Sequence, residues 1–352
     1  MTRPYRVALS GDFRLPGGAP AYPDFDLSPL LSDPRVETTW LPPGDRIRGG
    51  DLEDTDALVL LAPRFDAASL PASGRLALVA RFGVGYDSVD VAACSAAGVA
   101  VSVTPDGVRR PVAVAILTLL FALAGRLMDK DRITRAGPGG FHTRSRFMGT
   151  GLVGRTLASV GMGNIGAEMF RLAAPFGMRH VAADPAADPA LARELGVELV
   201  PLDDVFRRGD FVAVNCPLSD ATRGLVDARR IALMKPAAYL INTARGPIVD
   251  QPALVAALRE GRIAGAGLDV LDPEPPPADD PVLALDNVVL APHALSWTDQ
   301  AFAGIGASAL ASVRAVLDGR APDHLVDRSV AAAPAFLARL AALRARDGDG
   351  TA

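Results

Sequence analysis

The sequence predicts an α/β protein built of two doubly wound, Rossmann-like parallel sheets. Short apolar runs alternate with helix-patterned segments along nearly all of the 352 residues. The runs lack strict apolar–polar alternation, which is typical of strands covered by helices on both faces. Gly (34) and Pro (29) are plentiful and aromatic residues make up 5%, a composition that favours many short elements joined by tight turns. At about 150 residues per domain, the length indicates two domains.

The apolar runs mark the expected strands. They are residues 6–9, 57–61, 76–80, 99–103, 156–160, 180–183, 211–215, 238–242, 264–269 and 287–290. Helical patterns cover residues 108–127, 164–176, 228–234, 252–260 and 298–318. Because strand and helix alternate in this order, we expect parallel sheets.

Breaks in this pattern define the expected domains. Residues 1–105 form the first domain together with residues 297–328, because the amphipathic stretch near the end of the chain would return to the first sheet. Residues 106–296 form the second domain, which includes a polar, glycine-rich stretch at 135–151. Residues 329–352 are expected to be a C-terminal tail.

Composition narrows the possible functions. A hydrophobic fraction of 49% excludes wholesale disorder. The net charge of −4 argues against nucleic acid as the main partner, since phosphate binding needs a basic surface. Two cysteines, Cys94 and Cys216, are too few for a disulfide framework or a zinc site, so no metal is expected. The first residues lack the apolar core of a signal peptide, and no run of about 18 uncharged apolar residues could form a transmembrane helix. These observations predict a cytoplasmic protein that binds no membrane.

A glycine-rich segment beginning at Gly161 reads GMGNIG and matches G-x-G-x-x-G. The pattern is weak alone, but an expected strand ends directly before it and an amphipathic helix follows. Gly161 would allow the tight turn, Gly163 would let the backbone approach a pyrophosphate, and Gly166 would let the helix pack closely on the strand. Asn164 and Ile165 begin that helix, whose N-terminus attracts phosphate charge. The segment predicts a dinucleotide site.

Asp184 indicates which dinucleotide is bound. It ends the next expected strand, 18 residues after Gly166, close to the roughly 20 residues typical of an acid that binds ribose hydroxyls. A carboxylate there would repel a 2′-phosphate, and the following Pro-Ala-Ala-Asp supplies no cation. The sequence therefore favours NAD over NADP.

Polar side chains follow three of the later strands. Arg245 closes the segment NTAR, Asp269 is followed closely by Glu274, and His293 follows an apolar run. Because ligands bind at the carboxyl ends of strands in a doubly wound sheet, these side chains are expected to converge. A carboxylate, an arginine and a histidine beside a nicotinamide suit hydride transfer to or from a 2-hydroxy acid.

Several blocks of sequence then carry a family resemblance. They are RFGVGYD from Arg81, GMGNIG from Gly161, CPL from Cys216, MKPAAYLINTARGPIVD from Met234, GRIAGAGLDVLDPEP from Gly261 and PH at Pro292. In order and spacing the chain resembles the D-isomer-specific 2-hydroxyacid dehydrogenases over about residues 81–326. The resemblance implies an NAD-dependent oxidoreductase of D-2-hydroxy and 2-keto acids, of the glyoxylate/hydroxypyruvate or the phosphoglycerate type. It also implies a substrate-binding first domain, an NAD-binding second domain, an active-site cleft between them, and a homodimer.

The resemblance further implies a role for each site residue. Arg245 would bind the substrate carboxylate and polarise the reacting oxygen, and His293 would exchange the hydroxyl proton. Glu274 would hydrogen-bond the other imidazole nitrogen and favour the protonated ring. Asp269 would lie near the nicotinamide. Residues that would line the cofactor groove beside Arg245 and His293 are Cys216, Pro217, Thr243 and Ala244, and those that would offer backbone N–H groups to the substrate carboxylate are Val84 and Gly85.

The chain departs from the family pattern at the start of the long inter-domain helix. The family commonly has an Asn there, followed by Val-Ala-Glu, whereas Val108 and Val114 occupy these positions here. Arg109 and Arg110 would either bind a second anionic group of the substrate or lie solvated. Trp297 would either shape the substrate pocket or serve in apolar packing at the start of the following helix.

Two alternatives remain at the level of sequence. One is a dinucleotide-sensing regulator, similar to the corepressors that share this fold. The other is a phosphite-type dehydrogenase on the same framework. Formate-oxidising relatives have Gln where this chain has Glu274, so we do not expect formate as the substrate.

Overall fold

The computed structural model describes residues 3–348, and the chain divides into two compact units. Unit 1 comprises Met1–Val108 and Thr298–Ala352, and unit 2 comprises Arg109–Trp297. The described part of the tail expected at residues 329–352 belongs to unit 1. Its helix places Phe336, Leu340 and Leu343 in the core of that unit, because they recur on one face at helical spacing.

Unit 1 is built on a five-stranded parallel sheet with the order β2-β1-β3-β4-β5. Its strands are β1 (Tyr5–Leu9), β2 (Val36–Trp40), β3 (Ala57–Leu60), β4 (Leu78–Arg81) and β5 (Ala100–Ser102). Its helices are α1 (Ser28–Leu31), α2 (Val91–Ala96), α11 (Asp299–Leu317) and α12 (Pro334–Gly348). Alternate strand residues enter two apolar clusters, as a sheet covered on both faces requires: Val7 and Val59 lie in one, Ala8 and Leu58 in the other.

Unit 2 holds a seven-stranded parallel sheet with the order β12-β11-β10-β9-β6-β7-β8. Its strands are β6 (Thr156–Val160), β7 (Arg179–Ala183), β8 (Val197–Leu199), β9 (Phe211–Val214), β10 (Tyr239–Asn242), β11 (Gly265–Leu268) and β12 (Val288–Leu290). The strand order reverses beside β6, which pairs with β7 on one side and β9 on the other. This reversal creates the switch point at which doubly wound sheets bind ligands.

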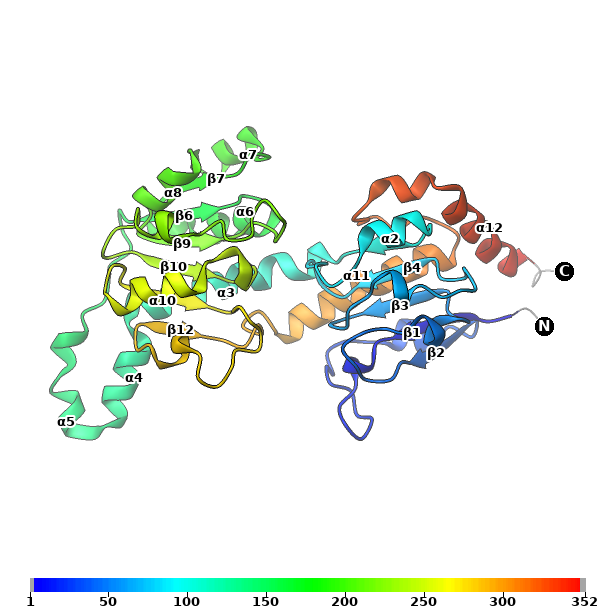
Figure 1. The fold of residues 1–352 in the computed structure, drawn as a ribbon, viewed down its shortest axis with the longest axis horizontal. Helices are drawn as coiled ribbons and strands as arrows, with labels where there is room; N and C mark the ends of the chain where they lie inside the picture. Colours follow the sequence, from blue (N-terminus) through cyan, green and yellow to red (C-terminus); the bar gives the residue numbers. More distant parts are fainter. Residues whose placement is uncertain (1–2, 349–352) are drawn as a thin grey trace. The chain divides into compact units, whose positions relative to one another are not determined.

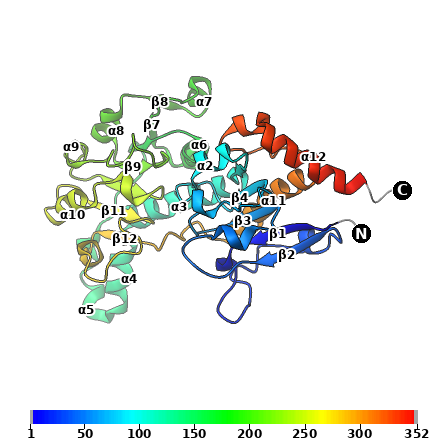
Figure 2. The same cartoon turned by 45° about the vertical axis from the view of Figure 1, so that its right-hand side comes forward.

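Helices cover both faces of the unit 2 sheet (Figures 1 and 2). They are α3 (Pro105–Gly125), α6 (Asn164–Ala173), α7 (Pro189–Glu194), α8 (Leu202–Arg208), α9 (Ala228–Ile231) and α10 (Gln251–Arg259). Residues of α3 and α6 share one apolar cluster with alternate strand residues, and residues of α8, α9 and α10 share the other. The prediction of an α/β protein with two doubly wound sheets is confirmed.

Three short helices occupy much of the stretch expected to be a polar connection. They are α4 (Leu127–Arg135), α5 (Gly137–Phe141) and the 3-10 turn Arg144–Phe147. None of them contains a buried residue, and both views show α4 and α5 outside the layers of the unit 2 sheet (Figures 1 and 2). We call residues 127–148 the arm.

Two helices, α3 and α11, are long and apolar enough to span a membrane by length and composition. In each helix, 56% of the most apolar 18-residue segment is buried. Ile116 and Leu120 of α3 lie in a core cluster of unit 2, and Val313 and Val316 of α11 lie in the core of unit 1. Packing against a sheet therefore accounts for the hydropathy of both helices.

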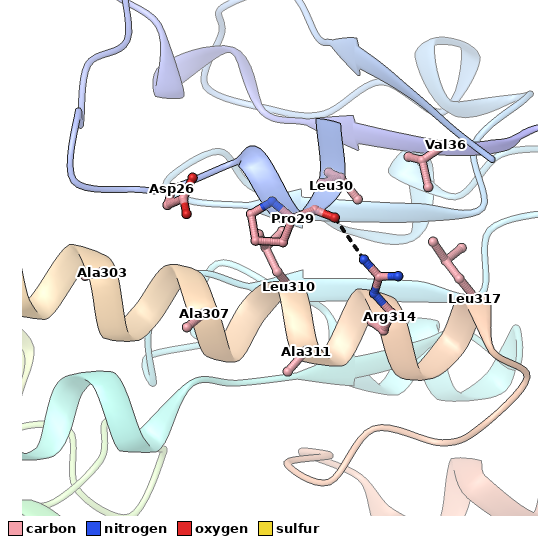
Figure 3. A pocket seen from close by; sticks show the side chains of 10 residues that line it. All are labelled: Asp26, Pro29, Leu30, Val36, Ala303, Ala307, Leu310, Ala311, Arg314 and Leu317. Atoms are coloured by element: carbon pink, nitrogen blue, oxygen red, sulfur yellow. Dashed lines mark hydrogen bonds between the residues drawn. The ribbon is translucent and has the colours of Figure 1, made fainter. Parts of the chain in front are cut away.

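A cavity of about 450 Å³ lies in unit 1 between α1 and α11 (Figure 3). Its lining is mostly apolar, and Arg314 donates to the carbonyl oxygen of Pro29 at 2.8 Å and to Asp33 at 3.0 Å. The remaining charged side chain of its lining is Asp26. No predicted site residue lines this cavity, and its one arginine is already hydrogen-bonded, so we do not assign it a catalytic role.

Candidate active site

The glycine-rich loop joins β6 to α6 at the switch point of the unit 2 sheet. Gly161 has a φ of +98°, and a Cβ there would lie 2.8 Å from the backbone of Asn215. A Cβ on Gly166 would lie 2.8 Å from the carbonyl oxygen of Gly161. By contrast, a Cβ on Gly163, the N-cap of α6, would meet nothing within 4 Å, and no side chain caps this helix. The loop thus leaves open space beside unpaired N–H groups, and this arrangement fits a bound phosphate.

Two polar groups outside the sequence motifs, one buried and one partly buried, hold this loop. The Ser159 hydroxyl is fully buried and donates to the carbonyl oxygen of Gly161 at 2.5 Å. The Asn215 amide donates in turn to the Ser159 hydroxyl at 2.9 Å. Their signal in the sequence is a polar residue within or directly after an apolar run, which is where a hydrogen bond must compensate burial.

Asp184 lies directly after β7 and contacts the glycine-rich loop. One carboxylate oxygen accepts the N–H of Met162 at 2.8 Å, and the other accepts the N–H of Ala186 at 2.8 Å. The carboxylate is partly exposed. The structure therefore brings the predicted ribose-binding acid to the predicted phosphate-binding loop.

Cys216 and Pro217 follow β9 across the switch point from this loop. Burial raises the pKa of the Cys216 thiol to about 11, and that of Cys94 in unit 1 to about 12. Both cysteines are unpaired and stay protonated at neutral pH, so neither is an activated nucleophile. Residues 3–348 also contain no cluster of three His, Cys, Asp or Glu side chains that could hold a metal ion.

Arg245 lies in a loop that follows β10 and is fixed by the last residue of that strand. The Asn242 side chain accepts the N–H of Ala244 at 3.0 Å and donates to the carbonyl oxygen of Arg245 at 2.9 Å. A Cβ on Gly246 would lie 1.8 Å from the carbonyl oxygen of Leu271. The segment carrying Arg245 therefore packs directly against the segment that follows β11, where only glycine fits.

His293 and Glu274 are hydrogen-bonded to each other at the same edge of the sheet. The His293 Nδ1 atom lies 2.6 Å from Glu274 Oε1, and the two side chains are 40% and 39% exposed. Because a carboxylate accepts at Nδ1, that nitrogen carries the proton of the neutral ring. The Nε2 atom is then the nitrogen that can exchange a proton with a substrate.

Asp269 lies between these two loops and is 3% exposed. Its Oδ1 atom accepts the N–H groups of Ala294 at 3.0 Å and Leu295 at 3.1 Å, and its carbonyl oxygen accepts the N–H of His293 at 2.7 Å. Burial raises the pKa of the Asp269 carboxyl, while these backbone N–H groups oppose the shift. The carboxylate is thus directed toward the loop that carries His293.

The remaining predicted residues lie at several places. Val84 and Gly85 follow β4 in unit 1, and their part in substrate binding stays a prediction. Arg109 and Arg110 are both exposed, and Arg110 is ion-paired with Glu168 of α6 at 2.8 Å. Whether either arginine binds a second substrate anion stays a prediction. At the positions that depart from the family, Val108 is buried, while Val114 and Trp297 are about half exposed.

The two parallel sheets, the glycine-rich loop at a switch point and the His–carboxylate pair define a class, the two-domain nucleotide-dependent dehydrogenases. Comparison with known proteins is more specific. The family described as "D-isomer specific 2-hydroxyacid dehydrogenase, NAD binding domain" matches residues 117–294. The chain belongs to this family, and it is an NAD-dependent oxidoreductase of D-2-hydroxy and 2-keto acids.

Individual relatives agree with this assignment. The chain is 40% identical over 291 residues to a glyoxylate reductase from Korarchaeum cryptofilum, covering 82% of this chain and 88% of the relative. It is 38% identical to a D-3-phosphoglycerate dehydrogenase from Mycobacterium leprae, but it covers only 54% of that protein, against 81% of its own length. A crystal structure of a glyoxylate reductase from Paecilomyes thermophila superposes with a TM-score of 0.80 at 27% identity, covering 93% of this chain and 99% of that one.

Proposed function

We propose that the protein reduces glyoxylate and related short 2-keto acids with NADH. The observation that carries this proposal is the 2.6 Å pair between His293 and Glu274 at the carboxyl edge of the NAD-binding unit's sheet. Similarity to proteins named glyoxylate reductase over most of both chains supports the choice of substrate. The role of each residue below is part of the proposal.

The cofactor would be held by the loop and strand ends of unit 2. Gly161, Gly163 and Gly166 shape the phosphate-binding loop, and Asn164 and Ile165 present the first N–H groups of α6. Residues that would line the rest of the groove are Cys216, Pro217, Thr243, Ala244 and Asp269. When bound, NADH supplies the hydride.

Asp184 would set the preference for NADH. Its carboxylate already binds the loop N–H of Met162 and is partly exposed beside it. A ribose hydroxyl can donate to such a carboxylate, while a 2′-phosphate would be repelled by it.

The reaction needs one group that binds the substrate and one that moves a proton. Arg245 would bind the keto acid's carboxylate through its planar guanidinium and polarise the reacting oxygen. His293 would donate its Nε2 proton to that oxygen as the hydride arrives, and take it back during oxidation. Glu274 accepts from Nδ1, so it orients the ring and stabilises the imidazolium that reduction consumes.

The pairing of Arg110 supports small substrates over phosphorylated ones. Arg110 is hydrogen-bonded at 2.8 Å to Glu168, which also pairs with Arg171 at 2.6 Å. A phosphate group at this position would have to compete with the Glu168 carboxylate for the Arg110 guanidinium. We therefore propose glyoxylate or hydroxypyruvate rather than a phosphoglycerate-type substrate.

The arm supports a homodimer. Its helices bury nothing within the described chain, yet Leu127, Met128, Phe141 and Met148 expose apolar side chains. Such a surface needs a partner, and we propose a second copy of this chain. Light scattering should give the mass of a dimer for the wild type and of a monomer for the double variant Phe141→Glu, Met148→Glu. A monomeric wild type would contradict this proposal.

We also propose a cytoplasmic location. The two cysteines, Cys94 and Cys216, are not paired in a disulfide, and this suits a reducing compartment.

A panel of substrates tests the proposed function. NADH oxidation would be followed with glyoxylate, hydroxypyruvate, phosphohydroxypyruvate and branched 2-keto acids, with NADPH and phosphite oxidation as comparisons. We expect the highest kcat/KM with glyoxylate or hydroxypyruvate and NADH. Tight NADH binding without turnover of any keto acid would favour the dinucleotide-sensing alternative, and a preference for NADPH would contradict the role of Asp184.

A further inference from the structure

Two buried polar side chains lie at the carboxyl ends of neighbouring strands and contact the two loops that carry Arg245 and His293. Asn242 is the last residue of β10 and is 1% exposed, and Asp269 follows the last residue of β11 and is 3% exposed. The strands are paired in register, Asn242 with Leu268, and the N–H of Asp269 donates to the carbonyl oxygen of Asn242 at 2.9 Å. The two residues therefore form one rigid unit at the edge of the sheet.

Each side chain hydrogen-bonds the backbone of one of these two loops. Asp269 Oδ1 accepts two successive N–H groups, those of Ala294 and Leu295. Asn242 accepts the N–H of Ala244 and donates to the carbonyl oxygen of Arg245. Burying a carboxylate is costly unless such bonds compensate it, so these contacts account for a charged residue at this position.

His293 has an unusual backbone that these contacts explain. Its φ of +55° lies in the left-handed region, which non-glycine residues rarely adopt because the backbone is strained there. The N–H of His293 and the next two N–H groups are all accepted by Asp269, the first by its carbonyl oxygen and the others by its side chain. The backbone is thus held on both sides of the strained residue.

We propose that Asp269 and Asn242 are positioning residues: Asp269 holds His293 in its left-handed backbone conformation toward Glu274, and Asn242 holds the backbone of Arg245. The inference rests on the proposed roles of His293 and Arg245. It gives Asp269 a function in the loop geometry that does not depend on contact with the nicotinamide.

Two substitutions of Asp269 distinguish the effect of its hydrogen-bond acceptor from that of its negative charge. Asp269→Asn retains an Oδ1 acceptor, whereas Asp269→Ala removes it. For Asp269→Ala we expect kcat for glyoxylate reduction to fall on the order of tenfold or more. Asp269→Asn should restore most of the kcat. Loss of kcat in Asp269→Asn as large as in Asp269→Ala would overturn the proposal, because the charge would then be the active feature.

Hydrogen exchange supplies a readout that does not depend on turnover. Amide exchange of a peptide spanning residues 291–297 should be faster in Asp269→Ala than in wild type and unchanged in Asp269→Asn. Unchanged exchange in Asp269→Ala would overturn the inference. If Asp269→Ala does not fold, Asp269→Asn still decides, since a kcat more than about tenfold below wild type contradicts it. If the wild type reduces no keto acid, the proposed function fails while the exchange experiment still tests the loop.

A matched control lies at the opposite edge of the same sheet. Asp210 is 7% exposed and accepts the N–H of Thr156 at 2.8 Å, but it touches no loop that carries a proposed site residue. Asp210→Ala should lower the melting temperature and leave kcat unchanged. An equal loss of kcat in Asp210→Ala would show that any buried carboxylate has this effect, and would overturn the assignment.

Loss of the Asn242 side chain should affect a different kinetic parameter from loss of the Asp269 side chain. Because Arg245 binds the substrate carboxylate, Asn242→Ala should chiefly raise the KM for glyoxylate, on the order of tenfold, with a smaller change in kcat. An Asn242→Ala enzyme with an unchanged KM for glyoxylate would contradict its role.

Discussion

Asp56 in unit 1 and Asp210 in unit 2 lie directly before a central strand, and each exchanges two hydrogen bonds with the first residues of the neighbouring strand. Asp56 bonds the backbone of Arg6, and Asp210 bonds the backbone of Thr156. Both carboxylates are also paired with cations, Asp56 with Arg75 at 2.7 Å and Asp210 with Lys235 at 2.9 Å. The amino edges of the two sheets are therefore built alike.

The carboxyl edge of the unit 2 sheet uses the same kinds of side chain differently. Asp184, Asn242 and Asp269 accept hydrogen bonds from the backbone of loops rather than from that of strands. Buried polar groups at the amino edges thus stabilise the sheets, whereas those at this carboxyl edge fix loops that carry proposed site residues. Substitutions at the amino edges should therefore change stability, and substitutions at this carboxyl edge should change turnover or binding.

The largest effect is expected at the amino edge of unit 1. The Asp56 side chain is 1% exposed, and Asp56→Ala would leave Arg75, 10% exposed, with only the more distant Asp54 carboxylate at 3.6 Å. Breaking such a buried pair costs about 3–5 kcal/mol. Urea unfolding should show this loss of free energy, while kcat/KM of the folded fraction stays at the wild-type value. A stable Asp56→Ala protein with impaired turnover would contradict the assignment of this carboxylate to sheet stability.

Loss of His293 should affect turnover alone. His293→Ala removes the proposed proton donor and acceptor, so kcat should fall at least on the order of 10²-fold in both directions. The melting temperature should stay the same, because the side chain is 40% exposed. His142→Ala, an exposed histidine of the arm, is the control and should behave as wild type. Turnover of His293→Ala close to that of wild type would show that the proton comes from another group.

A methyl group on the phosphate loop should weaken cofactor binding without destabilising the fold. The Cβ of Gly163→Ala would project into open space beside the N-terminus of α6. We therefore expect the KM for NADH to rise on the order of tenfold, about 1.4 kcal/mol, at an unchanged melting temperature. Gly151→Ala, where a Cβ also meets nothing within 4 Å, should change neither quantity. An unchanged KM in Gly163→Ala would place the pyrophosphate elsewhere.

Acid should weaken unit 1 through Asp56. Burial acts to raise the pKa of Asp56, but hydrogen bonds from Arg75, Arg6 and Arg346 outweigh it and hold the pKa below its usual value. A lowered pKa in the folded state contributes stability that is present above the unfolded pKa of about 3.9 and is lost as the pH falls through the folded pKa. The free energy of unfolding should therefore decrease in acid more steeply for wild type than for Asp56→Asn. Equal slopes would contradict this role.

Much of the fold could be predicted from apolar runs, but two edge strands could not. β2 alternates half-buried and exposed residues, and β8 has three residues of which two are exposed. Edge strands bury too little to produce a continuous apolar run. The helices of the arm were missed for a related reason, since none of their residues is buried and no apolar stripe forms.

Motifs in the sequence predict site residues where residue identity carries the chemistry, as at Arg245, Glu274 and His293. The structure brings Glu274 and His293 within 2.6 Å of each other, while the catalytic roles of the three residues stay a prediction. The contacts of Asp269 with Ala294 and Leu295 could not be predicted, because they depend on the left-handed backbone at His293. An Asp directly before an apolar run, as at Asp56 and Asp210, was a visible signal of a buried amino-edge carboxylate.

One paired measurement tests the division between the two edges most directly: the melting temperature and the kinetics of glyoxylate reduction in Glu274→Gln and Asp210→Asn. In Glu274→Gln an amide oxygen still accepts the Nδ1 proton of His293 but lacks the charge that stabilises an imidazolium, so kcat should fall on the order of tenfold at an unchanged melting temperature. In Asp210→Asn the pair with Lys235 is lost, so the melting temperature should fall by a few degrees while kcat/KM stays within about twofold of wild type. Wild-type kcat in Glu274→Gln, or a large loss of turnover in Asp210→Asn, would contradict the account.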